Sequence, residues 1–195
     1  MQEEAGESQE VQAGEGGGQP LVVPGQAPGQ RAGLDALAGR LRKAVPPLYG
    51  LLPRQVIHRD FEPRNVLVAG GRVTALLDFE FAAPDLRAID LARGLHAWTR
   101  GTLADDTAWE AIAAFAGGYR TRAARTAAEA RAVALLLLLS QLAIFVHWTG
   151  RYRRGMLSAD APANPVAGWA SRLLRLGDWL AAHEAELADR LTAAR

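Results

Sequence analysis

The stretch covering residues 56–80, VIHRDFEPRNVLVAGGRVTALLDFE, constrains the fold more than any other part of the chain. The β-rich run QVIH leads into a loop with the pattern H-x-D-x-x-x-x-N, formed by His58, Asp60 and Asn65. Two strand-like runs follow, NVLV and RVTALLDF, and Ala-Gly-Gly joins them. A Gly-Gly connection between aliphatic, β-branched runs predicts a β-hairpin.

A further acidic residue, Asp78, stands at the end of the second hairpin strand, 13 residues beyond Asn65. Because a hairpin folds back on itself, its far end returns to the loop that precedes it, and we expect Asp60, Asn65 and Asp78 to converge. This set suits phosphoryl transfer. A carboxylate orients the attacking hydroxyl and accepts its proton, and hard oxygen ligands hold Mg²⁺ against the phosphates.

Most of the remaining chain is predicted to be helical. Leucines recur at helical spacing over residues 32–44, and a Pro pair ends that helix. From residue 85 onward every segment has a helical pattern. The expected helices cover about 87–100, a segment after the Asp105-Asp106-Thr107 cap, about 127–154, and a last segment that starts at Asn164-Pro165. The predicted fold class is α+β, a mostly helical lobe with a small β-hairpin that carries the site.

Composition divides the chain at about residue 30. Residues 1–30 are rich in Gly, Gln, Glu and Pro and hold five Glu with no Lys or Arg, so we expect a disordered low-complexity segment. Residues 31–195 are expected to form one lobe. The net charge of +1 gives no indication of nucleic-acid binding. The first thirty residues lack the basic start and apolar core of a secretory signal, which favours a cytoplasmic location.

Residues 132–148, AVALLLLLSQLAIFVHW, are apolar on every side. A membrane span needs about 20 apolar residues, whereas this run has 17 and contains Ser140, Gln141 and His147. A helix that is apolar all round is either a membrane span or the central helix of a bundle. Because helical segments lie on both sides of it in the sequence, we expect a buried central helix and no membrane. A membrane-anchored helical protein is the alternative.

The segments IHRDFEPRNVLV and LLDFEFAAPDLRAIDLA resemble the catalytic loop and metal-binding strand of the aminoglycoside phosphotransferase-like kinases. That family includes choline kinases and type II homoserine kinases and is related in fold to protein kinases. The resemblance covers residues from about 32 to 193, and the loop, the hairpin, DFE and DLA occur in the family's order. It implies a protein-kinase-like C-terminal lobe that transfers the γ-phosphoryl group of ATP, with Mg²⁺, to the hydroxyl of a small molecule.

The resemblance also implies a role for each matching residue. Asp60 would be the catalytic base, and Asn65 and Asp78 would be Mg²⁺ ligands. His58 would support the loop, and Asp90 of the DLA segment would brace it through backbone hydrogen bonds.

Two further residues are accessory candidates. Many small-molecule kinases of the family have Gly where this chain has Arg59, which leaves the acceptor subclass open. Glu80 is a candidate for contact with the nucleotide or the metal, and a surface carboxylate is the alternative. The charged residues expected to face solvent are Glu62, Arg64, Arg87 and Arg93.

A kinase of this type also needs a nucleotide-binding lobe with a strand lysine and a phosphate-covering glycine loop. The single lysine, Lys43, lies in a helical pattern 17 residues before Asp60, and AGEGGGQP is not a G-x-G-x-x-G loop between strands. We therefore expect the ATP-binding N-lobe to be absent, and the chain to be a truncated enzyme with weak or no activity alone. The alternatives are a non-catalytic kinase-like binding module and a second chain that supplies the missing lobe.

Overall fold

The computed structural model describes residues 27–99, 108–124, 126–157 and 165–193, and these are mainly helical. The α-helices are α1 (Pro28–Ala44), α2 (Ala88–Trp98), α3 (Ala108–Arg120), α4 (Ala127–Arg153) and α5 (Val166–Ala193). The strands are β1 (Arg54–Ile57), β2 (Val66–Ala69), β3 (Arg72–Leu76) and β4 (Ala83–Leu86). Short 3-10 turns cover Pro46–Gly50, Pro63–Asn65 and Phe79–Phe81.

The helix ends agree with the sequence patterns in most places. Helix α1 begins at Pro28, so its first residues belong to the segment expected to be disordered, and residues 1–26 lie outside the described residues. The Asp105-Asp106-Thr107 cap and Asn164 also lie outside them.

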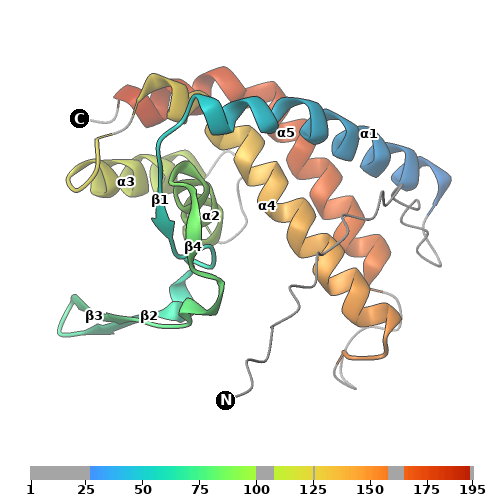
Figure 1. The fold of residues 1–195 in the computed structure, drawn as a ribbon, viewed down its shortest axis with the longest axis horizontal. Coiled ribbons are helices and arrows are strands. Elements are labelled where there is room, and N and C mark those ends of the chain that lie inside the picture. The colour runs from blue at the N-terminus through green and yellow to red at the C-terminus, as the bar shows by residue number, and fades with distance from the viewer. Residues whose placement is uncertain (1–26, 100–107, 125, 158–164, 194–195) are drawn as a thin grey trace, which may run out of the picture.

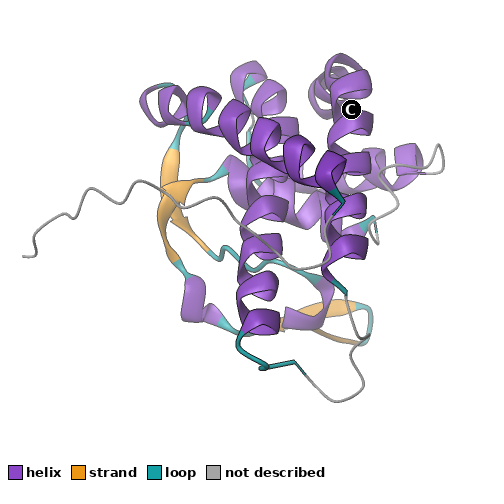
Figure 2. Ribbon diagram, turned by 90° about the vertical axis from the view of Figure 1, so that its right-hand side faces the viewer, coloured by secondary structure: helices purple, strands orange, loops and turns teal. Residues whose placement is uncertain are grey.

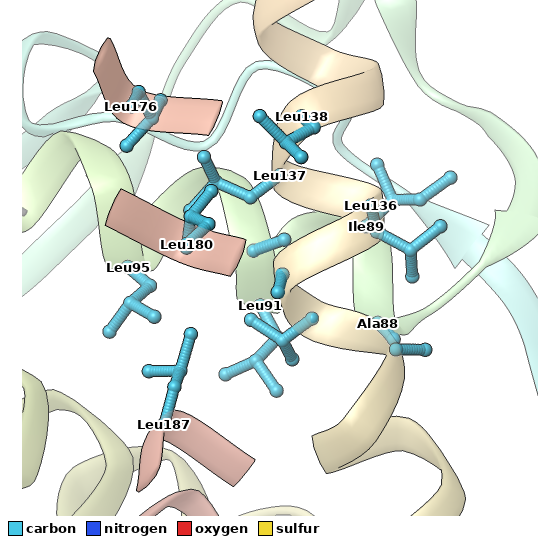
Figure 3. Close-up of a cluster of buried hydrophobic side chains, with 14 of the residues drawn as sticks. Ala88, Ile89, Leu91, Leu95, Leu136, Leu137, Leu138, Leu176, Leu180 and Leu187 are labelled. Carbon is cyan, nitrogen blue, oxygen red and sulfur yellow. The ribbon is translucent and has the colours of Figure 1, made fainter. Parts of the chain in front are cut away.

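The core is built on α4 and α5, which pack along each other, with α2 against α4 and α1 across both (Figure 1). Figure 3 shows leucines of α2, α4 and α5 meeting in one cluster. Each fully buried leucine stabilises the fold by about 1.5–3 kcal/mol. The leucines of these three helices that are at most 1% exposed are Leu91, Leu95, Leu136, Leu137, Leu138, Leu180, Leu187 and Leu191.

Helix α4 contains the apolar run discussed above. By length and composition it could cross a membrane, and half of its most apolar 18-residue window is buried inside the structure. Its first part, including Val133 and Leu136, is enclosed by α2 and α5. Its later part exposes Val146 and Trp148. The predicted burial of this helix therefore holds for its first part, whereas its later part is partly exposed.

The N-terminus of α4 is fixed by a capping box and an ion pair. Thr126 Oγ1 accepts a hydrogen bond from the Glu129 amide at 3.1 Å, and Glu129 Oε2 accepts one from the Thr126 amide at 2.8 Å. Arg87, at the start of α2, donates from Nε and Nη2 to the same carboxylate at 2.6 and 2.8 Å. Arg87 is therefore a partly buried residue that links two helices, and not the surface residue predicted from the sequence.

Glu129 is only 2% exposed. Burial raises the pKa of its carboxyl group, but the hydrogen bonds from Arg87 and Thr126 outweigh burial and leave this pKa below its ordinary value. The carboxylate therefore contributes stability above the ordinary Glu pKa, and this contribution is lost as the pH falls through the lowered pKa.

The strands form two small antiparallel sheets, which Figure 2 shows in separate places, one at the left and one at the lower right of the helices. Strands β2 and β3 form the predicted hairpin, and Gly70 and Gly71 connect them with φ angles of 56° and 74°. Positive φ at both turn positions suits Gly-Gly and matches the twist of the strands. The hairpin lies at the end of the molecule opposite α1 (Figure 1).

The strand β4 was not predicted, because residues 83 and 84 were assigned to no element and the chain from residue 85 onward was expected to be helical. It pairs with β1, and Val56 lies opposite Pro84. Pro84 and Asp85 both disfavour strands by propensity, so the pairing is imposed by the position of β1 and not by the local sequence.

We predict that Arg87→Met lowers the free energy of unfolding by about 3 kcal/mol, because it leaves the Glu129 carboxylate buried without its counter-ion. Urea unfolding followed by circular dichroism measures this change. Arg122→Gln is the matched control, because Arg122 is exposed in the turn after α3, and we expect it to change stability by less than about 0.5 kcal/mol. Equal effects of the two substitutions would contradict the assigned link.

Candidate active site

The loop between β1 and β2 is attached to helix α2 by one carboxylate. Asp90, in the first turn of α2, accepts hydrogen bonds from the consecutive backbone amides of His58 and Arg59 at 2.7 and 2.8 Å. Arg59 has a φ of 65°, a left-handed conformation that a residue other than Gly rarely adopts. The charge-assisted bonds to Asp90 offset the cost of this conformation.

His58 joins the loop to the end of the hairpin. Its ring is buried, and Nε2 lies 2.8 Å from the carbonyl oxygen of Leu77. A carbonyl only accepts, so Nε2 carries the hydrogen and donates it. The other ring nitrogen, Nδ1, is then free to accept the Asp60 amide at 3.2 Å. The Phe79 ring packs against the imidazole with centroids 4.7 Å apart.

Asn65 holds Asp60 from the far end of the loop. Its Nδ2 donates to the Asp60 backbone carbonyl at 2.8 Å and to Asp60 Oδ2 at 2.9 Å. Both side chains are buried. Because these bonds use the amide nitrogen, Asn65 Oδ1 faces the other way and has lone pairs for another ligand.

Leu77, the residue before Asp78, is held by hydrogen bonds at both its backbone amide and its backbone carbonyl. The Leu77 amide donates to the Asn65 carbonyl at 2.8 Å, while the Leu77 carbonyl accepts from His58. Asp78 itself has a φ of 64° and is exposed. The hairpin thus returns to the loop as the sequence suggested, and Asp78 is one residue from a direct backbone contact with Asn65.

Asp60 has a partner that the sequence did not predict. Arg93 Nη2 donates to Asp60 Oδ1, and only 17% of the Arg93 side chain and 12% of the Asp60 side chain are exposed. The expectation that Arg93 faces solvent is therefore wrong. Because α2 packs against the loop, a residue one turn after Asp90 on the same face of α2 reaches the loop carboxylate.

A second acidic residue, Asp85 of β4, organises the outer side of the loop. Its Oδ1 accepts from the Tyr49 hydroxyl and the Leu86 amide, both at 2.8 Å, and its Oδ2 lies 3.6 Å from Arg59 Nε. Partial desolvation, with the hydrogen bond and the charge of the Asp85 carboxylate, raises the pKa of the half-exposed Tyr49. Asp85 thus keeps the exposed Arg59 side chain at the rim of the loop. Asp85 lies on β4, the strand that the sequence did not predict.

The other charged loop residues differ in exposure. Arg64 is exposed, pairs with Glu62 and lies 3.9 Å from Asp60 Oδ2. Glu62 is only partly exposed, contrary to expectation, and burial together with the nearby Asp60 charge raises its pKa. Glu80 is exposed on the 3-10 turn after Asp78.

Close packing also holds α2 against the loop. A Cβ placed on Gly94 would lie 2.8 Å from Phe61 Cδ1 and 2.7 Å from Phe115 Cζ. Phe61 directly follows Asp60, so the absence of a side chain at position 94 permits the approach that brings Arg93 to Asp60.

The residues present fit a magnesium ion bound together with phosphates. Within the described part of the chain there is no cluster of three or more His, Cys, Asp and Glu side chains of the kind that holds a metal alone. Mg²⁺ needs few protein ligands, because waters and substrate phosphates complete its coordination. Asn65 Oδ1, which accepts no hydrogen bond from the described residues, and the exposed carboxylate of Asp78 are oxygen ligands of the right type.

Comparison with protein families identifies a match over residues 19–133, more than half of the chain, to the phosphotransferase enzyme family. The matched range contains the loop, both sheets, α2 and every site residue described above. The chain belongs to this phosphotransferase family.

The similar curated proteins include homoserine kinases. The homoserine kinase of Methylorubrum populi is 37% identical over 127 residues, which are 62% of this chain and 37% of that protein. The homoserine kinase of Gluconacetobacter diazotrophicus is 40% identical over 112 residues, 56% of this chain and 33% of that protein. The homoserine kinase of Nitrobacter winogradskyi is 36% identical over 135 residues, which are 65% of this chain and 38% of that protein. The chain therefore matches little more than a third of the length of these relatives.

We predict that Gly94→Ala lowers the free energy of unfolding by about 1–3 kcal/mol, because the added methyl group overlaps Phe61 and Phe115. Gly39→Ala on α1 is the matched control, since nothing lies within 4 Å of its added Cβ. There the better helix propensity of Ala is expected to raise stability by up to about 1 kcal/mol. Urea unfolding distinguishes the two signs, and a stabilising Gly94→Ala would contradict the close packing.

Proposed function

We propose that this chain is the catalytic lobe of an ATP-dependent phosphotransferase, which transfers the γ-phosphoryl group to the hydroxyl of a small molecule. The observation that carries the proposal is a connected set of hydrogen bonds. The His58 amide donates to Asp90 and the His58 ring donates to the Leu77 carbonyl, while the Leu77 amide donates to Asn65 and the Asn65 amide group donates to Asp60. This set holds the loop carboxylate and the end of the hairpin in one rigid unit, as in-line phosphoryl transfer requires.

In the proposed reaction the acceptor hydroxyl donates a hydrogen bond to the Asp60 carboxylate. Its oxygen forms a bond to the γ-phosphorus as the bond from that phosphorus to the bridging oxygen breaks, and ADP leaves with the bond's electron pair. The hydroxyl proton passes to Asp60 and then to solvent. When bound by Asn65 and Asp78, Mg²⁺ would supply positive charge to the phosphate oxygens.

L-Homoserine is the first acceptor to test, because the relatives reported above are homoserine kinases. Arg59, at the rim of the loop and paired with Asp85, is a candidate for contact with the acceptor. The family resemblance extends to other hydroxyl acceptors, so choline and an aminoglycoside belong in the same assay.

The distribution of apolar surface supports the idea that this lobe pairs with a nucleotide-binding lobe. Val56 on β1, Val73 on the hairpin and Phe79 beside the site are 68%, 68% and 56% exposed. The other exposed large apolar residues between positions 49 and 81 are Tyr49, Leu51, Leu67, Val68, Leu77 and Phe81. Exposed apolar side chains gathered around a polar site are typical of an interaction surface. We therefore expect weak or no activity from the chain alone.

A non-catalytic binding module is the second candidate. It is favoured by the two bonds already made to the Asp60 carboxylate, one at each oxygen. A module of this kind would bind a hydroxyl compound and would not transfer phosphate to it.

We predict that a chimera transfers phosphate from [γ-³²P]ATP to L-homoserine or to another acceptor of the panel. In this chimera, residues 32–193 of this chain would replace the matching region of the Methylorubrum populi homoserine kinase, and the rest of that kinase would be kept. Asp60→Asn is expected to lower kcat by about 10²–10⁴-fold, the contribution of a general base, with little change in the KM for ATP. The lobe alone should be far slower than the chimera.

The controls separate the two candidate functions. A folded chimera that binds Mg²⁺·ATP and phosphorylates none of the acceptors would support the binding module and overturn the proposed activity. Normal turnover by the Asp60→Asn chimera would show that Asp60 is not the base.

A further inference from the structure

We propose that Arg93 is a positioning residue for Asp60, which fixes the plane of the Asp60 carboxylate so that it faces the acceptor hydroxyl. This inference rests on the proposed function, since it assigns Arg93 a task in the same reaction. The direct contact between Arg93 Nη2 and Asp60 Oδ1 carries it.

The two oxygens of Asp60 are held by different partners. Arg93 holds Oδ1, and Asn65 Nδ2 holds Oδ2 at 2.9 Å. A carboxylate held at both oxygens cannot rotate about its last bond without losing one of these partners. Each oxygen of an ionised carboxylate has about two lone-pair sites. Asn65 uses one site on Oδ2, and the exposed Arg64 guanidinium lies 3.9 Å from the same oxygen. Oδ1, held by Arg93, keeps a second site for the hydroxyl hydrogen. The pairing thus orients Asp60 without blocking it.

Asp60 is the counter-ion that neutralises Arg93. The Arg93 side chain is 17% exposed, and its Nε is buried without a hydrogen-bond partner among the described residues. The titratable residues three positions from Arg93 on α2 are Asp90, whose carboxylate accepts the loop amides, and His96, whose pKa is lowered by burial and then by the Arg93 charge. The lowered pKa disfavours a second positive charge beside Arg93, so His96 does not compete with the guanidinium for the Asp60 carboxylate.

Helix α2 positions the loop in two ways from one face. Asp90 holds the backbone amides of His58 and Arg59, and Arg93, three residues later, holds the side chain of Asp60. Residues three apart on a helix lie next to each other. Loss of Arg93 should therefore free the carboxylate while the backbone of the loop stays attached through Asp90.

The test is NMR spectroscopy of the ¹⁵N-labelled 195-residue chain and its Arg93→Gln variant. The Asn65 side-chain amide reports on Asp60, and the backbone amides of His58 and Arg59 report on the loop. We expect the Asn65 Nδ2 protons to exchange with solvent about tenfold faster in Arg93→Gln, the equivalent of one hydrogen bond. The two backbone amides should keep their shifts and exchange rates.

Two further variants test the role of the charge and its geometry. Arg93→Lys should restore part of the protection of Asn65, because an ammonium group keeps the charge but lacks the planar fork of a guanidinium. Arg175→Gln removes an exposed arginine on α5, and we expect its spectrum around the loop to match the unmodified chain.

Thermal unfolding gives an independent readout of the same pair. Asp60→Asn leaves the Arg93 charge without its partner, so its melting temperature should fall by about 5–10 °C. The double variant Asp60→Asn, Arg93→Gln should recover at least part of this loss. A double variant whose loss equals the sum of the two single losses would overturn the pairing.

An unchanged Asn65 side-chain signal in Arg93→Gln would overturn the inference, as would a simultaneous loss of the His58 and Arg59 signals, which indicates general loosening. Failure of the proposed function looks different. In that case the chimera transfers no phosphate, while the Asn65 signature of Arg93→Gln is still present. If the chimera is active, Arg93→Gln should lower kcat by about 10–10²-fold and leave the KM for ATP nearly unchanged.

Discussion

The attachment of one loop to one helix is the constraint on which the rest of the site depends. A single carboxylate, Asp90, accepts two consecutive backbone amides of the loop, and this fixes a left-handed residue, Arg59, that would otherwise be strained. Once the loop backbone is set, the His58 ring can reach the end of the hairpin, and the Asp60 side chain can reach Asn65 and Arg93. Hydrogen bonds to charged groups contribute about 1.5–3 kcal/mol each, so the two bonds to Asp90 offset part of the entropy cost of ordering the loop.

The helical bundle makes this attachment possible by holding α2 rigidly. Leucines of α2 are buried against α4 and α5, and the Arg87–Glu129 pair ties the start of α2 to the start of α4. The site is therefore built on a helix whose position is fixed at both its apolar face and its N-terminus. Sites carried by such rigid elements hold their geometry better than sites on free loops.

The sequence predicted the parts of this arrangement that depend on local patterns. The Gly-Gly turn indicated the hairpin, the leucine spacing indicated helices, and the loop spacing indicated convergence of Asn65 with the far end of the hairpin. Strand β4 was missed, because Pro84 and Asp85 are poor strand formers. They form a strand here only because they pair with β1 in the folded protein. The roles of Arg87 and Arg93 were missed for the same reason. Their partners lie 42 and 33 positions away in the sequence, and no local pattern distinguishes a paired arginine from an exposed one.

The central claim is that Asn65 and Asp78 present two oxygen ligands to one divalent ion. Titration of the ¹⁵N-labelled chain with Mn²⁺ tests it most directly, because a paramagnetic ion broadens only the signals near it. We expect the Asn65 side-chain amide and the backbone amides of Asp78 and Phe79 to broaden first, and Asp78→Ala to abolish this effect. Broadening that begins at other acidic groups, such as Glu184 and Glu186 on α5, with the Asn65 and Asp78 signals unaffected, would contradict the assigned site.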